Sequence, residues 1–546
     1  MKDNFAQAAI LALFVAFCTT VSASPRPSSR SVRKPQSKPV DGVVAKPVAF
    51  PLKLSANNRY LIDQNGRPFL IVGDSPQGIM GRLTEKEADD YFADREARGF
   101  NTLGWINVLC AGHDYPTNTY ATTPDGIRPF TGSLSHRFAG FFSHGSDYTY
   151  YDLSKPNEAY FIRLDDILRL AQRHHFLVFL DPIETIGWLP VLRRNGLDAA
   201  YAYGQFLGRR YGRYPNVIWL NGNDFWNWRE GQDGAVWAAA QNGVRSFLHT
   251  WPRRNDDALV RAVAEGIRSE ARPQLQTLEL EPSTSSSFDD PTWKSLIWLN
   301  GTYTYFPAYL QTLVSYNQQP TAPTWLMESR YEFDHGDTPP DEGVPSILRR
   351  QEYWAMLSGG TGQFHGSAYI WPFKDGWRDK LDTISIKQVE YWRDFFLSIP
   401  WQNLIPDQAG SVLTSGAGGT CDFTSWVGKC FHAQAASSSD GSVVVIYSPS
   451  PRLLSINMGA LNHPALATWF DPSNGTYKAV NSDPLPNSGI QQFISPGKNQ
   501  DGDEDWVLLF RAVDQPPPSP KERPTIAATP RRVLKKGVAP RRKIRK

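Results

Sequence analysis

The chain has 546 residues, too many for one ordinary hydrophobic core, and its 41% hydrophobic and 13% aromatic content predicts two globular domains with extensions. Its net charge of +3 is unevenly spread, because residues 24–48 carry +5 and residues 515–546 carry +10, which leaves −12 on the remainder. This acidic body excludes a fold that binds nucleic acid through a basic surface, and the chain lacks zinc, nucleotide and serine-hydrolase motifs, so we expect no metal and no cofactor.

The first 23 residues are typical of a secretory signal peptide. Lys2 precedes an apolar segment from Ala8 to Val21, and Val21-Ser22-Ala23 offers a cleavage site of small residues. The apolar segment is short for a membrane span, so we expect it to be removed and the protein to be secreted or periplasmic. No transmembrane segment is expected in the mature chain. Residues 24–48, rich in Pro, Ser, Arg and Lys, are predicted to be a disordered leader.

The folded part is predicted to begin at residue 49 with a hairpin and a first buried strand. Two short runs flank Asn57-Asn58, and residues 69–74 form an apolar run that ends in Gly73 and Asp74. Thr84 to Glu87 is a capping box, and helical spacing follows it until Gly99. Residues 100–107 then read as a second strand, so the order is strand, helix, strand.

The same alternation continues to residue 400. Six further runs are predicted strands: residues 176–181, 216–224, 275–280, 296–302, 324–328 and 368–371. Helical spacing marks residues 160–171, 200–207, 236–271, 347–357 and 384–396. Eight strands alternating with helices over residues 49–400 predict an α/β fold, a (β/α)8 TIM barrel. An open doubly wound sheet is the alternative, but the glycine-rich turn expected after its first strand is missing.

Residues 401–512 follow a different pattern. Short apolar runs such as 442–447, 467–470 and 506–510 are separated by turn clusters without helical spacing, which predicts a small all-β sandwich domain. Cys421 and Cys430 lie nine residues apart in this region and are predicted to form a disulfide in an oxidising compartment. Residues 513–546 are Pro-rich and then basic, and are predicted to be a disordered tail. The tail is either inert or held on anionic polymers by its charge.

Two predicted strands end in a carboxylate at facing positions of such a barrel. The fourth strand ends in Asp224 and the seventh ends in Glu328. Catalytic groups of barrel enzymes lie at these strand ends, and a glycosidase needs one protonated and one ionised carboxyl group. We therefore predict a glycoside hydrolase in which these two residues are catalytic and close enough for a retaining mechanism. Asp224 could instead cap a turn, and Glu332 is the alternative nucleophile if its strand ends later.

Several segments resemble the apiosidase-like glycoside hydrolases. The matching segments are residues 69–101, with a strand that ends in Gly-Asp-Ser and a later Arg-Gly-Phe-Asn, residues 216–224, residues 328–332, and residues 350–362. Residues 469–475 resemble the β-sandwich domain that often follows this barrel and is labelled collagen-binding. The resemblance implies that Asp224 is the acid/base and Glu328 the nucleophile. Gln77 replaces a usual tryptophan and Asn223 a usual glycine, so we expect these two positions to affect which sugar is accepted.

Seven further residues are candidates for sugar binding because they lie at or near predicted strand ends. They are Asp74, Asn107, Asp181, Asn223, Tyr331, His365 and Trp371. The first three could instead fix loops, His365 could be structural, and Trp371 could pack in the core. Tyr331 lies three residues after Glu328 and is placed to donate a hydrogen bond to a carboxylate. The predicted reaction is hydrolysis of a glycosidic bond in plant or microbial cell-wall polysaccharide. The alternative is a protein that kept the barrel and binds carbohydrate, or attaches to the envelope, without catalysis.

Overall fold

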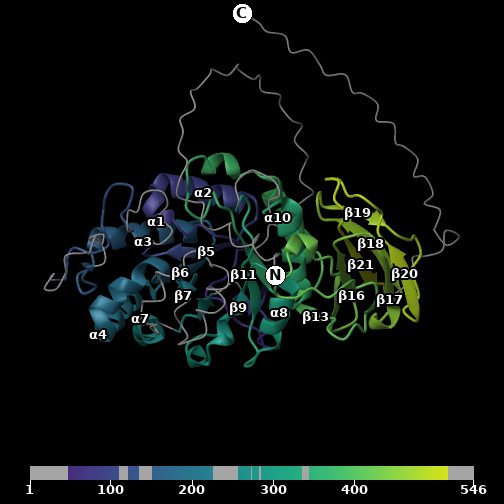
Figure 1. Cartoon of the computed structure of the whole chain (residues 1–546), viewed down its shortest axis with the longest axis horizontal. Helices are drawn as coiled ribbons and strands as arrows, with labels where there is room; N and C mark the ends of the chain where they lie inside the picture. The colour runs from purple at the N-terminus through teal and green to yellow at the C-terminus, as the bar shows by residue number, and fades with distance from the viewer. Residues whose placement is uncertain are drawn as a thin grey trace, which may run out of the picture.

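The computed structural model describes residues 47–109, 121–134, 150–225, 256–271, 273–281, 284–334 and 343–513. The predicted signal peptide, the leader up to residue 46 and the basic tail lie outside these residues, as does part of the helix predicted at 236–271. The described chain forms a barrel of strands and helices beside a smaller β domain (Figure 1). No helix among the described residues combines the length and apolar character needed to span a bilayer.

Eight parallel strands form the barrel, in the order β8-β7-β6-β5-β4-β12-β11-β10. Their bounds are β4 (Ile71–Asp74), β5 (Thr102–Asn107), β6 (Leu177–Asp181), β7 (Val217–Phe225), β8 (Gln276–Leu280), β10 (Asn300–Thr304), β11 (Thr324–Glu328) and β12 (Gly362–His365). The ring closes where the backbone N–H of Trp298 donates a 3.0 Å hydrogen bond to the carbonyl of Gln276. A short strand, β9 (Thr284–Ser286), pairs antiparallel with β10. The predicted (β/α)8 barrel is confirmed.

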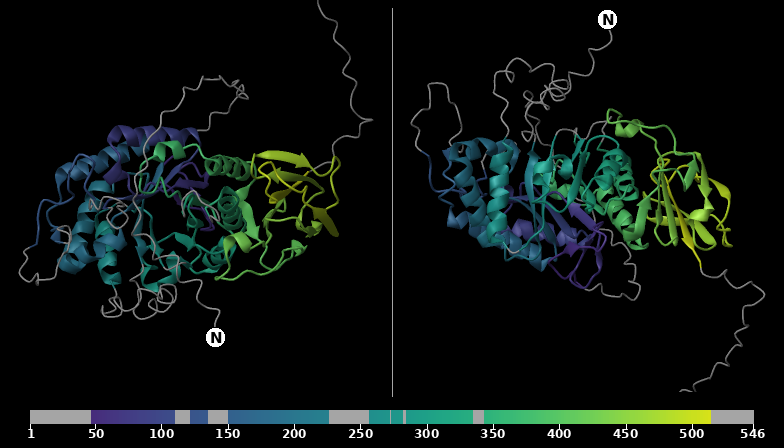
Figure 2. Two further views of the ribbon diagram at one scale, coloured as in Figure 1. Left: turned by 45° about the horizontal axis from the view of Figure 1, so that its top comes forward. Right: turned by 90° about the horizontal axis from the view of Figure 1, so that it is seen from below.

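Helices cover the outside of this ring (Figure 2). They are α1 (Ile79–Arg82), α2 (Glu85–Ala97), α3 (Glu158–Arg173), α4 (Thr185–Tyr211), α7 (Asp257–Glu270), α8 (Ala308–Asn317), α9 (Pro345–Leu357) and α10 (Ile384–Leu397). The predicted capping box begins α2, because the Thr84 side chain accepts the Glu87 N–H and the Glu87 carboxylate accepts the Thr84 N–H. α8 was not predicted.

Aromatic side chains fill the inside of the barrel beneath the strand ends. Phe364 lies 5.3 Å from Trp105 and 5.0 Å from Phe179, measured between ring centroids. A Cβ at Gly73 or Gly104 would lie 2.3 Å or 2.6 Å from the Phe364 ring, so both positions need glycine. A three-stranded antiparallel sheet of β1 (Lys53–Leu54), β2 (Leu61–Ile62) and β3 (Pro68–Phe69) adds apolar side chains to the same cluster. Side chains therefore close the barrel interior from below.

The eighth strand differs from the prediction. The apolar run at 368–371 forms turns, and the strand is β12, which pairs with β4 and β11. β12 carries Gln363 and His365, so half of this buried strand is polar and its sequence lacks an apolar run. The sixth strand, β10, also begins later than predicted, at Asn300, for the same reason.

The C-terminal region is an antiparallel β-sandwich, as predicted. One sheet has six strands: β13 (Leu404–Pro406), β15 (Gln434–Ser438), β16 (Val443–Ser448), β21 (Trp506–Ala512), β18 (Ala465–Asp471) and β19 (Thr476–Ala479). The other has three: β14 (Leu413–Ser415), β17 (Leu453–Asn457) and β20 (Ile490–Ile494). Apolar side chains from both sheets pack between them, including Val444, Leu454, Phe493 and Leu508. Cys421 and Cys430 form the predicted disulfide.

The sandwich packs on α9 of the barrel, and apolar residues of both parts belong to one buried cluster. Tyr353 of α9 stacks on Tyr447 of β16, with ring centroids 5.2 Å apart. Arg349 of α9 is buried and donates to Asp505 at 2.6 and 2.9 Å and to Asp503 at 2.8 Å. These contacts connect the two parts through apolar packing and a buried ion pair.

Candidate active site

A bulge at the end of β7 positions Asp224. Asn221 pairs with Leu278 of β8 and Phe225 pairs with Leu280, so β7 has two residues more than its partner between these pairs. Gly222 has φ +67° and Asp224 has φ +48°, a left-handed conformation that aspartate tolerates better than most residues. Bulges beside active sites redirect side chains, and this one interrupts the regular alternation of β7 immediately before Asp224.

Three carboxylates from different strands meet at this end of the barrel. Asp224 of β7, Glu279 of β8 and Glu328 of β11 each place one oxygen within 4.8 Å of the other two. Glu279 is fully buried, Glu328 is 5% exposed and Asp224 is half-buried. The predicted fourth and seventh strands therefore bring Asp224 and Glu328 together, as the sequence indicated. Oxygen ligands at this spacing also suit a hard divalent cation, and among the residues that the structure describes these three are the group that could hold it.

Two tyrosine hydroxyls bind Glu328. Tyr305, which follows β10, donates to Oε1 at 2.6 Å, and Tyr331 donates to Oε2 at 3.0 Å. Burial, followed by the negative charge of Glu328, raises the pKa of each tyrosine well above its usual value. The hydroxyls therefore keep their protons and remain donors. Gln77 contacts the second of them, because its Nε2 donates a 3.3 Å hydrogen bond to the Tyr331 hydroxyl.

Asp224 is connected to Glu279 through the backbone. Oε2 of Glu279 accepts the N–H of Asp224 and the side-chain amide of Asn223, both at 3.0 Å. Burial, and then the charges of Glu328 and Asp224, raise the pKa of Glu279 well above its usual value. Tyr303 donates to Oδ1 of Asp224 at 3.2 Å. Glu279 therefore supports the backbone beside Asp224 through a carboxyl group whose burial favours the protonated form.

Asn107 and Asn223 lie together in the same region. The Asn107 amide is 3.3 Å from Oδ1 of Asn223, and both side chains are fully buried. Asp181 of β6 is also buried and accepts the backbone N–H of Ile183. Burial raises the pKa of Asp181 well above its usual value against that hydrogen bond, with the charges of Glu184 and Asp224 adding to the rise. These three predicted residues therefore lie near Asp224, at the carboxyl ends of β5, β6 and β7.

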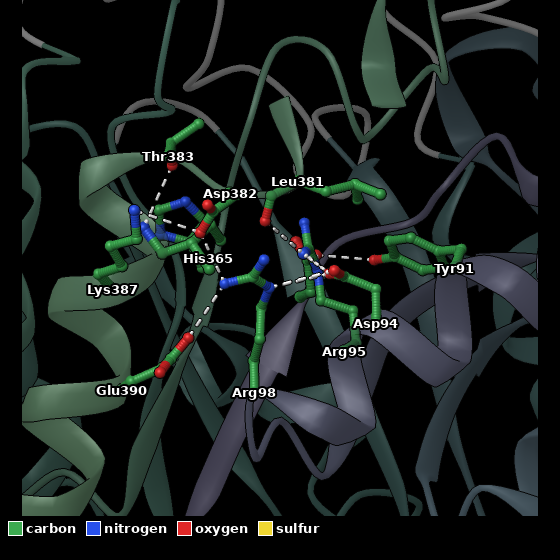
Figure 3. A network of polar contacts seen from close by, with 12 residues as sticks. Tyr91, Asp94, Arg95, Arg98, His365, Leu381, Asp382, Thr383, Lys387 and Glu390 are labelled. Carbon is green, nitrogen blue, oxygen red and sulfur yellow. Dashed lines mark hydrogen bonds and ion pairs between the residues drawn. The ribbon is translucent and has the colours of Figure 1, made fainter. Parts of the chain in front are cut away.

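His365 and Arg95, the partner of Asp74, lie in a polar network between the barrel and its outer helices (Figure 3). Asp74 accepts hydrogen bonds from Tyr91 and Arg95 of α2, and Arg95 also donates to the carbonyl of Leu381 before α10. His365 lies 3.6 Å from Glu332 and 3.7 Å from Glu352. The partners of Asp74 and His365 are therefore side chains of the protein, contributed by the barrel and its helices.

The pKa of His365 follows from these surroundings. Burial opposes the charged imidazolium, but hydrogen bonding to Glu332 and Glu352 and their negative charges raise the pKa to about 10. Glu332, the alternative nucleophile, also accepts the Thr383 hydroxyl at 3.0 Å. The side chain of Trp371 is half-buried, and its backbone carbonyl accepts the Gly78 N–H at 2.7 Å. Direct sugar contacts by Asp74, His365 and Trp371 stay predictions.

Sequence reasoning missed three residues of the site: Glu279, Tyr303 and Tyr305. Glu279 lies between Leu278 and Leu280 in the strand predicted at residues 275–280, and a single carboxylate between two leucines was the available signal. Both tyrosines lie beyond the predicted end of the sixth strand, which was set at residue 302. The alternation of residues 302–305 between threonine and tyrosine was the signal that this strand continued.

The comparisons with known proteins agree with this geometry. Residues 55–403 match the family model "Apiosidase-like, catalytic domain", and residues 428–511 match "Putative collagen-binding domain of a collagenase". Among curated proteins no match was found. A solved structure named "Glycoside hydrolase" is 19% identical with a TM-score of 0.64, and the match covers 86% of this chain and 98% of that one.

A glycoside hydrolase family 5 structure from Bacteroides vulgatus is 20% identical with a TM-score of 0.64, and the match covers 84% of this chain and 93% of that one. At such identities the two solved structures establish the fold, while the family model covers most of the chain. The chain therefore belongs to the apiosidase-like family, and the protein is a glycoside hydrolase.

Proposed function

We propose that the protein is a secreted, retaining glycoside hydrolase that cleaves a glycosidic bond in plant or microbial cell-wall polysaccharide. The observation that carries the mechanism is the pairing of Asp224 with a Glu328 that accepts two tyrosine hydroxyls. Hydrogen bonds to a carboxylate favour its ionised form, and an ionised carboxylate is what a nucleophile requires. The short distance between the carboxylates supports retention, because inverting enzymes leave room for a water molecule between theirs.

In this mechanism Glu328 attacks the anomeric carbon while Asp224 protonates the leaving oxygen. The bond to the leaving group breaks as the bond to Glu328 forms, which gives a covalent glycosyl-enzyme. Asp224 then takes a proton from water, and the hydroxide attacks the same carbon and releases Glu328. Tyr305 and Tyr331 stabilise the charge on Glu328 before attack and again as it leaves. Tyr303 and the backbone contact to Glu279 hold Asp224 in place.

Secretion is supported by the predicted signal peptide and by the disulfide between Cys421 and Cys430, which is typical of oxidising compartments. The substrate class rests on the family match and on the aromatic and carboxylate-rich site. A screen against plant cell-wall oligosaccharides, with NMR detection of the first anomer released, tests both substrate and stereochemistry. Release of the inverted anomer would contradict the retaining mechanism.

The alternative is a protein that binds carbohydrate without turnover. Both carboxylates and their tyrosine donors are present, which argues against lost catalysis. Tight binding on a glycan array, with no reducing ends released from any bound glycan, would support this alternative.

A further inference from the structure

The disulfide loop (residues 421–430) of the sandwich region brings the Trp426 side chain close to the active site. Arg330, two residues beyond Glu328, has its guanidinium carbon 5.2 Å from the Tyr305 ring centroid and 6.0 Å from the Trp426 ring centroid. Tyr305 is the residue that donates to Glu328. A short series of contacts therefore leads from Glu328 through Tyr305 and Arg330 to Trp426.

The disulfide loop is fixed to the barrel by hydrogen bonds. Arg350 of α9 donates to the carbonyls of Val427 and Cys430, both at 3.0 Å, and the N–H of Cys421 donates to the Tyr309 hydroxyl at 3.2 Å. Val427 is fully buried. The loop backbone is therefore held at both ends, by two barrel helices and by its own disulfide.

Two aromatic residues of this fixed loop face solvent. Trp426 is 50% exposed and Phe423 is 38% exposed, although large aromatic side chains are normally buried in a folded core. The loop also lies outside the family matches for most of its length, because these end at residue 403 and resume at residue 428. Neither family description therefore assigns a role to Trp426 or Phe423.

We infer that Trp426 forms a sugar-binding subsite at the rim of the active site, which takes a sugar unit of a glycan chain beyond the bond that is cleaved. This inference rests on the proposed hydrolase function and names a feature of its substrate, an oligosaccharide or polysaccharide longer than one glycosidic unit. Flat aromatic faces exposed on a rigid loop suit the apolar C–H face of a sugar ring. Arg330 holds the Trp426 ring on one side by a cation–π contact.

The first test compares substrates of increasing length. Trp426→Ala should raise KM by about three- to tenfold for oligosaccharides of four or more units, the range expected for one aromatic contact, and by less as the substrate shortens. The value of kcat should change less than KM. Trp426→Phe should restore part of the loss. Tyr477→Ala is the matched control, because Tyr477 is 46% exposed on β19 of the same region. An equal KM change at all lengths, or no change, overturns the inference.

A second test separates this inference from the proposed function. Affinity electrophoresis in gels that contain pectin or xylan compares Glu328→Gln with Glu328→Gln/Trp426→Ala, so that no hydrolysis is needed. The first variant should be retarded more than the second, and a Tyr477→Ala change should have no such effect.

Equal mobility of the two variants in every gel overturns the subsite. A dimer that Trp426→Ala dissociates would also overturn it, because Trp426 would then contact a second copy. Failure of the hydrolase function appears separately, as no sugar released by the unaltered chain.

The loop itself offers a further check. Cys421→Ser/Cys430→Ser removes the covalent closure and leaves both aromatic residues in place. If the disulfide holds Trp426 in position, this variant should show part of the length-dependent KM increase of Trp426→Ala. Unfolding curves establish that the barrel remains folded. If the folded variant keeps the KM of the unaltered protein for substrates of every length, the disulfide is not needed to position Trp426.

Discussion

The side-chain amide of Asn223 donates a 3.0 Å hydrogen bond to Oε2 of Glu279, the oxygen that also accepts the N–H of Asp224. Asn223 is in turn bound by Asn107, so β5, β7 and β8 are linked by side chains directly beneath the proposed acid/base. The residue that departs from the family pattern at this position is thus fully buried, and its amide supports a neighbouring carboxyl group. An effect of Asn223 on the accepted sugar would act through the placement of Asp224.

Glu279→Gln should make stability less dependent on pH. The raised pKa of Glu279 means that the folded protein keeps a proton that the unfolded chain releases above about pH 4.5. The free energy of unfolding contributed by this group therefore falls as pH rises from about 4.5 toward the folded-state pKa. Glutamine resembles the protonated carboxyl group and does not titrate. Denaturant unfolding between pH 4.5 and 9 should show a shallower decline for Glu279→Gln, with the exposed Glu504→Gln as control. Identical slopes would contradict the account.

Removing either hydroxyl that binds Glu328 should slow turnover. A hydrogen bond to a charged group contributes about 1.5–3 kcal/mol, so Tyr305→Phe and Tyr331→Phe should each lower kcat by roughly 10- to 100-fold. Loss of a donor disfavours the ionised carboxylate, so the acidic limb of the pH–rate profile should move to higher pH. A lower kcat without this movement would indicate that the tyrosines act only on packing.

Arg349 is predicted to be essential for joining the sandwich to the barrel. Arg349→Ala leaves Asp505, whose side chain is 3% exposed, buried without its cation, and breaking such a pair costs about 3–5 kcal/mol. Thermal unfolding should show a clearly lower midpoint than for Arg378→Ala, which removes an exposed ion pair with Glu87 and should cost at most about 1 kcal/mol. A barrel truncated after residue 401 that keeps full stability and activity would contradict a supporting role for the sandwich.

The basic tail gives a prediction from charge alone. Residues 515–546 carry +10, so the full chain should be retained on immobilised pectin at low salt and released as salt screens the attraction. A chain that ends at residue 514 should be retained less. Retention that is equal for both chains, or insensitive to salt, would exclude an electrostatic role for the tail.

The sequence predicted those parts of the site that depend on local patterns. Apolar runs that end in a carboxylate correctly placed Asp224 and Glu328 on the fourth and seventh strands, and the spacing of Tyr331 correctly placed its hydroxyl near Glu328. Glu279 was missed because it lies one residue before the predicted strand end at Leu280, and β12 was misplaced because half of its residues are polar. The position of Trp426 depends on packing between two regions of the chain, which local pattern cannot predict.

The most direct test of the central claim is the turnover of Glu328→Gln. This substitution preserves the size of the side chain and removes the charge that attacks the anomeric carbon, so unfolding should remain close to that of the unaltered protein. On the best substrate from the oligosaccharide screen, kcat should fall by at least about 10⁴-fold, and no glycosyl-enzyme should be detected by intact-protein mass spectrometry. A folded Glu328→Gln variant that keeps most of its activity would contradict the assignment of Glu328 as the nucleophile.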